Sequence, residues 1–405
     1  MILSIAWRNI WRNKVRSLVV IISMTTGVFA GVFSAALFKG MMVDRINTGI
    51  ETEISHIQVH HPGYLANNDL QHLIQNADSI ESGLRLSGWI SQLVSRVLVN
   101  GMVTSAETGA GIRLVGIDPA AERTVTNLHK KISEGSYFTG NEKNPIIVSK
   151  KTADKLKVKL KSKIILTFQN LQGDIVQAAY RVAGIYKTEN SAFDESNAFV
   201  LKHQLVSLTE IPDNSVHEIA ITISDPEDTD EITAMIAGKL KNMDVQSWKQ
   251  LYPDFGYMVA MMDQMMYIFV LIILMALGFG IVNTMMMVVL ERVRELGMLM
   301  AVGMGKIKIF LMIMLETVLL SCTGGLAGIL AGILVSKHFE THGISFTQYT
   351  EAFNQFGYSS VFHTRIEAEM VVIISFLVLI TGILAAIYPA RKALKLNPCD
   401  ALRNR

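Results

Sequence analysis

Four long apolar runs constrain the fold of this chain more than any other feature of its sequence. They occupy residues 17–38, 267–290, 309–335 and 370–388, and the first two contain no charged residue. About 20 helical residues cross a hydrocarbon core of roughly 30 Å, so each run is long enough to span a bilayer. We therefore expect a polytopic α-helical membrane protein with transmembrane helices at 17–38, 267–290, 309–335 and 369–388.

The composition agrees with a membrane protein. Half of the 405 residues are hydrophobic, only 18% are charged, and the mean hydropathy is +0.34. Such a balance excludes a disordered chain and disfavours an ordinary soluble enzyme. The net charge of +2 gives no indication of nucleic-acid binding, and we expect none. Two cysteines, Cys322 and Cys399, are too few for a disulfide framework.

The flanking charges predict the orientation. Thirteen basic residues lie in 1–16, 291–308 and 389–405, whereas the segment 336–368 contains two. The positive-inside rule then places both termini and 291–308 in the cytoplasm. Segments 39–266 and 336–368 would face the periplasm of a bacterial inner membrane. A cleaved signal peptide is the weaker alternative for the first run, because its 22 residues exceed the 7–15 of a signal core.

The segment 1–16 is predicted to form a cytoplasmic amphipathic helix. Leu3, Trp7, Ile10 and Trp11 recur at helical spacing, and Arg8 lies on another face. Tryptophan and arginine suit the headgroup region of a membrane. This helix could be a simple anchor that sets the membrane topology, or it could have a mechanical role. At the other end of the chain, 389–405 is expected to be a cytoplasmic tail.

The insertion 39–266 is predicted to be an α+β periplasmic domain, in two lobes. Alternating or β-branched runs favour strands, and polar runs with periodic apolar positions favour helices. The expected strands are 55–60, 94–99, 112–117, 145–149, 164–169, 178–186 and 218–224, and the expected helices are 67–86, 151–156 and 230–240. Residues 258–266 lead into the second span without Gly or Pro, which predicts one continuous helix.

No catalytic constellation is evident. The chain lacks G-x-x-x-x-G-K-[ST] and G-x-S-x-G, and His217-Glu218 lacks the second histidine of a zincin. His56, His60 and His61 crowd one strand end, but no cysteine or acid joins them at ligand spacing. We therefore expect a chain that is not an enzyme, with no metal and no cofactor of its own.

Two rows of small residues predict close helix packing within the membrane, either inside the chain or against a second copy. The rows are Gly27, Gly31 and Ala35 in the first span and Gly324, Gly328 and Gly332 in the third. Glu316 also lies in the third apolar run, where a carboxylate is costly. We expect it to make a structural interaction rather than to carry protons.

The strongest local pattern follows the second span on the predicted cytoplasmic side. It reads Glu291-Arg292-Val293-Arg294-Glu295-Leu296-Gly297 and continues to Ala301-Val302-Gly303. A short charged helix that ends in small residues is suited to docking a soluble partner. The pattern resembles the E-R-x-[RK]-E-x-G-x-x-x-A-x-G segment of FtsX/MacB-like ABC transporter permeases. Residues 6–16 and 388–403 are similar to the opening and closing motifs of that family.

Within the family, the inserted domain is similar to the LolC/LolE lipoprotein-releasing branch. The similar segments are 55–60, 62–64, 116–119, 193–194 and 245–248. Two departures stand out. Lys161-Ser162-Lys163 replaces a common Gly-Asp turn, and Met300 replaces a frequent basic residue, which puts the turn chemistry and the affinity for an ATPase in doubt.

The resemblance implies a permease subunit that hydrolyses nothing itself. A separate ABC ATPase dimer, which binds ATP and Mg, would dock on a coupling helix and loop at 291–308 through the residues of the charged pattern. These residues are Glu291, Arg292, Arg294, Glu295, Gly297, Ala301 and Gly303. A second permease subunit, identical or of the LolC/LolE type, would dock on the same ATPase dimer.

In the lipoprotein-releasing branch an acylated protein leaves the membrane and passes to a periplasmic chaperone. By that resemblance, the Gly27 face and the methionine-rich start of the second span would line a cavity for lipid or substrate. The predicted lining residues are Met258, Met262, Met265, Met266 and Phe269, which we favour over a copper-binding cluster. The alternatives are MacB-like export of a peptide, toxin or drug, and FtsX-like signalling to a periplasmic enzyme.

Overall fold

The computed structural model describes residues 2–12, 14–139 and 143–394. The side chains of 2–5, 16, 227, 254–255, 258–260 and 262–263 lie outside this description. The chain divides into two compact units. The helical unit comprises Met1–Val43, Val259–Ser345 and Val361–Arg405, and the sheet unit comprises Asp44–Met258 and Phe346–Ser360.

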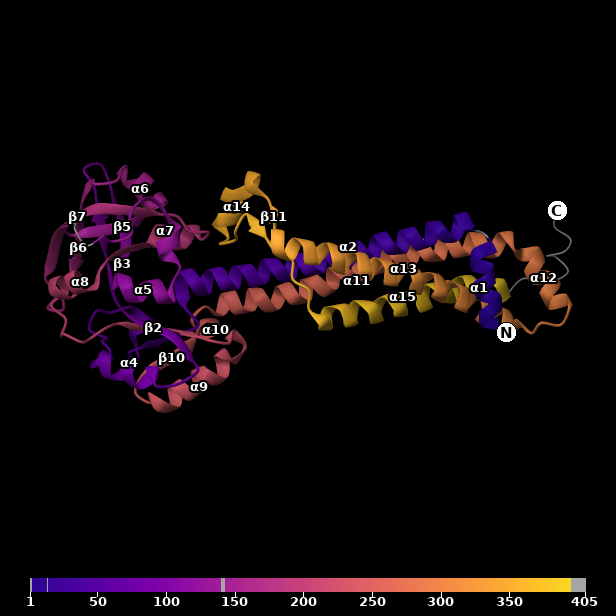
Figure 1. Ribbon diagram of the computed structural model, residues 1–405, viewed down its shortest axis with the longest axis horizontal. Coiled ribbons are helices and arrows are strands. Elements are labelled where there is room, and N and C mark those ends of the chain that lie inside the picture. The colour runs from indigo at the N-terminus through magenta and orange to yellow at the C-terminus, as the bar shows by residue number, and fades with distance from the viewer. Residues whose placement is uncertain (1, 13, 140–142, 395–405) are drawn as a thin grey trace. The chain divides into compact units, whose positions relative to one another are not determined.

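In the described part of the chain, the helical unit is built from four long helices and two short ones, α1 and α12 (Figure 1). They are α1 (Ile2–Arg12), α2 (Lys14–Gly49), α11 (Pro253–Glu291), α12 (Val293–Ala301), α13 (Lys306–His342) and α15 (Ala368–Leu394). A short antiparallel pair, β11 (Ile344–Ser345) with β12 (Val361–Phe362), follows α13. Within the described residues, four helices are long and apolar enough to cross a membrane, over Ser17–Ile54, Gln264–Glu291, Lys306–His342 and Ala368–Leu394.

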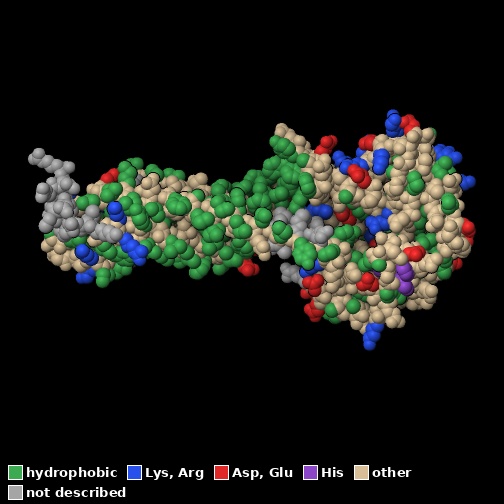
Figure 2. Space-filling view, turned by 180° about the vertical axis from the view of Figure 1, so that it is seen from behind, with side chains coloured by type: hydrophobic (Ala, Val, Ile, Leu, Met, Phe, Trp, Pro, Cys, Tyr) green, Lys and Arg blue, Asp and Glu red, His purple; other side chains and the backbone are tan. Residues whose placement is uncertain are grey.

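The core of the helical unit contains side chains from all four long helices. Val28 of α2, Met285 of α11, Ile313 of α13 and Ile374 of α15 are each at most 3% exposed. The outward faces are also apolar, and Phe279 is 75% exposed. Figure 2 shows hydrophobic side chains covering the visible face of these helices. A surface of this kind suits lipid rather than water, because lipid tails are as apolar as the side chains.

The glycine row of α13 lies against α2. A Cβ added to Gly324 would lie 2.9 Å from the carbonyl oxygen of Ile21, and one added to Gly328 would lie 2.7 Å from that of Thr25. The Thr25 hydroxyl donates to the carbonyl of Gly324 at 3.2 Å. Gly332 packs on Val32 in the same way. The two helices therefore approach through their backbones, as small residues allow.

The small residues of α2 do not face that glycine row as a set. A Cβ on Gly27 would collide with Leu277 of α11, at 2.3 Å, whereas one on Gly31 would meet open space among the described residues. Ala35 is buried, with 1% of its surface exposed. The two predicted rows of small residues therefore do not pack on each other. The row of α13 packs on α2, whereas Gly27 of α2 packs on α11.

Ten strands form the sheet of the sheet unit (Figure 1). They are β1 (Ile57–His60), β2 (Ile90–Thr104), β3 (Gly109–Ile117), β4 (Ile132–Gly135), β5 (Pro145–Ser149), β6 (Lys163–Gln169), β7 (Ile175–Tyr186), β8 (Asn197–Leu201), β9 (Glu218–Ile223) and β10 (Asp244–Ser247). The long strand β2 belongs to both halves of this sheet. Its residues 90–96 pair with β9, whereas residues 97–104 pair with β3.

The two halves have different topologies. The first is an antiparallel sheet in the order β10-β1-β9-β2. In the second, the pairings run from β2 through β3, β8, β5, β7 and β6 and return to β2. A ring of pairings leaves no free edge among its members, which removes a site of unwanted strand addition.

Short helices connect the strands of the sheet unit. They are α3 (Tyr64–Asn67), α4 (Ala77–Arg85), α5 (Pro119–Val125), α6 (Lys150–Leu156), α7 (Ser191–Ser196), α8 (Lys202–Thr209), α9 (Thr229–Lys239), α10 (Trp248–Leu251) and α14 (Thr350–Gln355), with η1 (Ile50–Ile54), η2 (Leu128–Lys131), η3 (Pro226–Asp228) and η4 (Thr347–Tyr349). Asp118 and Ser149 begin α5 and α6 by accepting hydrogen bonds from backbone N–H groups.

One expected helix, 67–86, is wrong over about half of its length, from Asn68 to Asn76. Asn68 and Asn76 adopt left-handed backbone conformations, with φ of 51° and 54°, which stop a right-handed helix. Between them Ile74 forms a β-bridge with Val216. Only the last part of the segment is helical, as α4.

Candidate coupling site and membrane cavities

The charged pattern after the second span folds into α12. Arg292 precedes the first residue of this helix, and Leu296 and Gly297 are buried on its inner face. Leu296 joins the core of the helical unit. The charged residues occupy the remaining faces, so the sequence folds here as an amphipathic helix anchored by its apolar side.

A chain of ion pairs connects α12 with two other helices. The Arg292 guanidinium donates from Nε to Glu295 Oε2 at 3.0 Å and from Nη1 to Glu316 Oε2 at 3.0 Å. The Arg12 guanidinium donates from Nη2 to Glu295 Oε1 at 2.7 Å. The order Arg12–Glu295–Arg292–Glu316 therefore links α1, α12 and α13, and we call it the charge chain.

The two ends of the charge chain differ in burial. The side chains of Arg292 and Glu316 are 11% and 7% exposed, whereas those of Arg12 and Glu295 are 51% and 42% exposed. The hydrogen bond from Arg12, with a further bond from Arg292, lowers the pKa of Glu295 below its ordinary value. Glu295 consequently remains an acceptor for both guanidinium groups at neutral pH.

Gly303 ends α12 in a Schellman motif. Its N–H bonds to the carbonyl of Met300 at 3.1 Å, and the N–H of Met304 bonds to that of Leu299 at 2.9 Å. Gly303 has a φ of +97°, which glycine adopts without steric cost. The turn leaves Val302 and Ile307 89% and 75% exposed.

The structure places the predicted coupling residues in two groups. Arg292, Glu295 and Gly297 face the helical unit and hold α12 in place. Glu291, Arg294, Ala301 and Gly303 are exposed. Sequence reasoning did not find Arg12 as a partner of Glu295, because the two residues are 283 positions apart. Motif similarity pointed to their segments but not to the contact.

An apolar cavity of about 350 Å³ lies in the furrow between α2 and α11. We call it the α2–α11 furrow. It is lined by Val20, Ser23, Met24, Gly27, Ile273, Ala276, Leu277, Gly280, Ile281 and Thr284. Gly27, one of the residues expected to face a lipid or substrate cavity, is among them.

The predicted methionines whose side chains are described, Met265 and Met266, lie outside the furrow. Met266 is buried, whereas Met265 is 63% exposed. Phe269 packs edge-on against Phe38 of α2 with ring centroids 5.9 Å apart. The side chains of Met258 and Met262 lie outside the described part of the chain. Neither Met265, Met266 nor Phe269 lines the α2–α11 furrow.

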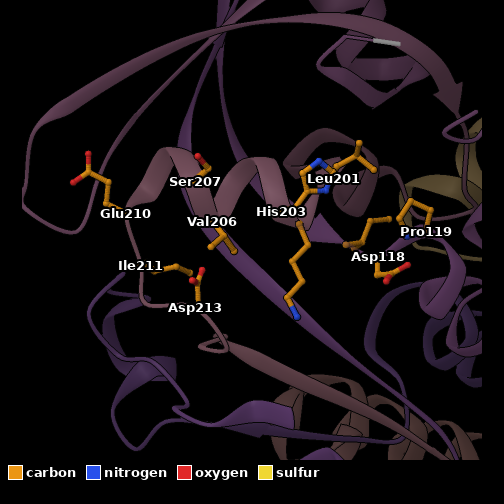
Figure 3. Close-up of a pocket in the computed structure, with 11 residues that line it drawn as sticks. Asp118, Pro119, Leu201, His203, Val206, Ser207, Glu210, Ile211 and Asp213 are labelled. Carbon is orange, nitrogen blue, oxygen red and sulfur yellow. The ribbon is translucent and has the colours of Figure 1, made fainter. Parts of the chain in front are cut away.

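A surface groove of about 660 Å³ lies along α8 in the sheet unit (Figure 3). Two of its polar side chains, Asp118 and Lys202, are used in local structure. Asp118 accepts a hydrogen bond from the N–H of Ala120 at 2.9 Å, and Lys202 donates to the Ser95 hydroxyl at 2.6 Å. Burial lowers the pKa of Lys202 below its ordinary value.

Of the three crowded histidines, His60 lies in β1 and is tied into the fold. His60 places Nδ1 3.0 Å from the carbonyl of His217 and Nε2 3.0 Å from the amide oxygen of Gln58. Both ring nitrogens are thus occupied. Across the described ranges, no group of three or more ligating side chains is arranged to hold a metal ion.

Comparison with known proteins places both units. Residues 267–398 match the model of the FtsX-like permease C-terminal family, and residues 17–239 match that of the MacB-like periplasmic core domain. The chain is 23% identical to an uncharacterized ABC transporter permease of Methanocaldococcus jannaschii, over 67% of this chain and 65% of the relative. It is 22% identical to the pyoverdine export ATP-binding/permease protein PvdT of Pseudomonas fluorescens, over 98% of this chain and 58% of the relative.

A third relative matches at nearly full length on both sides. The lipoprotein-releasing system transmembrane protein LolC of Neisseria meningitidis is 21% identical, over 97% of this chain and 95% of the relative. The chain thus spans less than two thirds of the archaeal permease and of PvdT, but almost all of LolC. Since one family model covers more than half of the chain and the other covers three of its four candidate spans, the chain belongs to the FtsX/MacB-like family of ABC transporter permeases.

Proposed function

We propose that this permease transmits motion from a separate ATPase, docked on α12 and its loop, across the inner membrane, and that its cargo is a lipoprotein released for sorting to the outer membrane. The charge chain is the observation that carries the coupling role. It connects the exposed loop after the second span to α13 through charge-assisted hydrogen bonds, which are stronger than neutral ones.

The path of motion follows from the contacts. A partner that pushes on Arg294 and Val302 displaces α12, and the bonds of Arg292 carry the displacement to α13. The glycine row of α13 packs on the backbone of α2. Close-packed backbones have little room to absorb a shift, so α2 moves with α13.

The partners follow from the family. The ATPase dimer binds ATP and Mg, because this chain has no phosphate-binding loop of the Walker type. Two permease subunits, identical or paired as LolC and LolE, form the membrane part. Both termini lie in the cytoplasm, the sheet unit lies in the periplasm, and a periplasmic chaperone receives the cargo.

Two observations support lipoprotein release. The match to LolC covers 95% of that protein, whereas PvdT, named as an ATP-binding/permease protein, is matched over 58% of its length. The α2–α11 furrow is lined mostly by apolar side chains, which suits an acyl chain. Phe38 and Phe269 lie on the same two helices, α2 and α11. In the sequence, each stands between the residues that line the furrow and the sheet unit.

Export of a peptide, toxin or drug is the second candidate. A macrolide export ATP-binding/permease protein MacB of Chlorobium luteolum is 34% identical, although over only 31% of this chain. Transmembrane signalling of the FtsX type needs the same coupling loop but no cargo furrow.

The test is purification of the tagged chain from native membranes, followed by mass spectrometry of the proteins that remain bound. We expect an ABC ATPase and an acylated protein. The paired change Arg294→Glu and Val302→Glu should remove the ATPase, whereas Lys337→Glu, an exposed lysine near the other end of α13, should not. Recovery of the ATPase without acylated protein would reject lipoprotein release, and recovery of the ATPase with the paired variant would reject docking on α12.

A further inference from the structure

A second concavity, of about 810 Å³, lies where α1 and α2 meet the last part of α11. We call it the basic groove. It is lined by Arg12, Lys14, Val15, Val19, Asn283, Thr284 and Met287. Two cations occur among these residues and no acid, and Val15 and Met287 are 80% and 59% exposed. The lining therefore combines positive charge with an open apolar wall.

The cations of the basic groove have donors to spare. Both hydrogen bonds between Arg12 and Glu295 use Nη2 of the guanidinium, so Nε and Nη1 are not engaged by that carboxylate. Among the described residues, no carboxylate forms an ion pair with Lys14. An anion that enters the groove can accordingly meet an ammonium group and part of a guanidinium group.

The basic groove continues into the α2–α11 furrow. Thr284 lines both concavities, and the neighbours Val19 and Val20 line one each. From Lys14 to Gly27 a helix rises about 20 Å. One leaflet of a hydrocarbon core is about 15 Å thick. A trough of this length with a charged mouth has the dimensions of one phospholipid, with its phosphate at the mouth and an acyl chain inside.

The depth of the mouth agrees with a headgroup. The first candidate span begins at Ser17, three residues after Lys14. On α1, Trp7 and Trp11 are 45% and 51% exposed and pack edge-to-face with centroids 6.0 Å apart. Exposed tryptophans beside a span are typical of the headgroup level. A soluble anion would not account for the apolar wall, and a second copy of the chain would need an acid to face this mouth.

We propose that the basic groove and the α2–α11 furrow together bind one anionic phospholipid, whose phosphate lies on Lys14 and Arg12. The site shares the α2–α11 furrow with the proposed cargo path, and it differs from that path in its cationic mouth at the N-terminal end of α2, so the phospholipid and a cargo acyl chain would compete for the furrow. It also adjoins the charge chain, since Arg12 belongs to both. A bound phosphate would share the Arg12 guanidinium with Glu295 and weaken the attraction between them, so anionic lipid adjusts how firmly α12 is held. The proposal requires only that these helices span a bilayer, and it therefore stands or falls independently of cargo and ATPase.

Native mass spectrometry of the full chain with its co-purified partners tests the site. Phosphatidylglycerol and phosphatidylethanolamine are titrated separately into the detergent-solubilised protein. We expect one phosphatidylglycerol per chain to be retained in preference to phosphatidylethanolamine. Lys14→Gln should weaken this retention about five-fold, as the loss of one basic contact at a membrane surface predicts. Arg8→Gln is the matched control, because Arg8 is exposed on α1 but does not line the groove.

A second variant separates the trough from surface charge. Val19→Trp fills the apolar wall, leaves both cations, and should also abolish retention of the single lipid. Three results would overturn the proposal: equal retention of the two lipids, equal losses in Lys14→Gln and Arg8→Gln, or full retention in Val19→Trp. A Lys14→Cys variant that forms a disulfide between two copies in membranes would show that a second chain occupies the groove, and would also overturn it.

Discussion

The guanidinium of Arg292 lies 3.0 Å from the carboxylate of Glu316, and this ion pair joins the start of α12 to the interior of α13. Both side chains are nearly buried, at 11% and 7% exposure. A carboxylate within an apolar span is costly unless it is paired. The contact explains how Glu316 is accommodated and gives it a structural partner.

Removal of one member of this pair should destabilise the helical unit. Glu316→Gln leaves the Arg292 charge buried without its main partner, which typically costs about 3 kcal/mol or more. We expect a clearly lower unfolding temperature in detergent. The joint change Arg292→Met and Glu316→Met should recover most of the loss, since no buried charge remains. Glu369→Gln, at an exposed glutamate in the first turn of α15, is the control. An unchanged unfolding temperature for Glu316→Gln would contradict the assignment.

The end of α12 offers a second test with a built-in control. Gly303→Ala places a Cβ on a residue whose φ is +97°, which costs about 1 kcal/mol or more. Gly305 has a φ of −62° and no atom within 4 Å of an added Cβ in the described part of the chain. We expect hydrogen exchange of the Gly303 and Met304 amides to accelerate in Gly303→Ala and to stay unchanged in Gly305→Ala. Similar exchange in the two variants would argue against the Schellman motif.

The long helices were predictable because the thickness of a bilayer sets their minimum length. The ends of these helices were not predictable, because helical hydrogen bonding continues through polar residues beyond the apolar runs. Helix α2 continues past Phe38, the predicted end of the first span, to Gly49, and α13 continues past Val335 to His342. Seven of the ten strands were predictable from alternation or β-branched runs. The strands β4 (ISEG), β8 (NAFVL) and β10 (DVQS) were missed, because none of them combines its short length with a clear alternation or a β-branched run.

Sequence patterns located the candidate site without its contacts. The charged motif marked α12, but nothing local in it reveals that Glu295 meets Arg12 or that Arg292 meets Glu316. The glycine spacing likewise indicated that two helices pack closely, but not which face of the neighbouring helix is in contact. Gly328 of α13 contacts Thr25 and Val28 of α2 rather than Gly27. Such pairings depend on tertiary packing over long separations in the chain.

The stability of the sheet unit should depend on pH through His217. Its side chain is buried, with Nδ1 accepting from the N–H of Leu98 at 3.2 Å and Nε2 near the carbonyl of Leu70 at 3.1 Å. The first nitrogen is therefore unprotonated. Burial lowers the pKa of His217 from 6.5 to about 4. A lowered pKa stabilises the fold above pH 6.5, and this contribution disappears as the pH falls toward 4.

His217 contributes at most about 3 kcal/mol to the free energy of unfolding, because its pKa in the folded state lies about 2.5 below its ordinary value. Asp194 acts in the opposite direction, because burial raises its pKa to about 6 and favours the protonated folded form. We therefore compare variants rather than absolute curves. His217→Asn should lose less stability than the wild type between pH 7 and pH 4.5 in thermal unfolding, whereas exposed His203→Asn should follow the wild type. Parallel curves for His217→Asn and wild type would refute the role of His217.

The packing of α13 on α2 can be tested with two alanines. A Cβ on Gly328 would lie 2.7 Å from the carbonyl oxygen of Thr25 and 2.8 Å from the Cβ of Val28, so Gly328→Ala must push the helices apart. Overpacking of this kind costs about 1–3 kcal/mol. Gly31→Ala adds the same methyl group to a helix of the same unit where the described structure leaves open space. Because both changes raise helix propensity equally, the difference between their unfolding temperatures isolates the contact. We expect Gly328→Ala to unfold at a lower temperature than the wild type and Gly31→Ala to match it. If Gly31→Ala is the more damaging of the two, a second copy of the chain packs on that face.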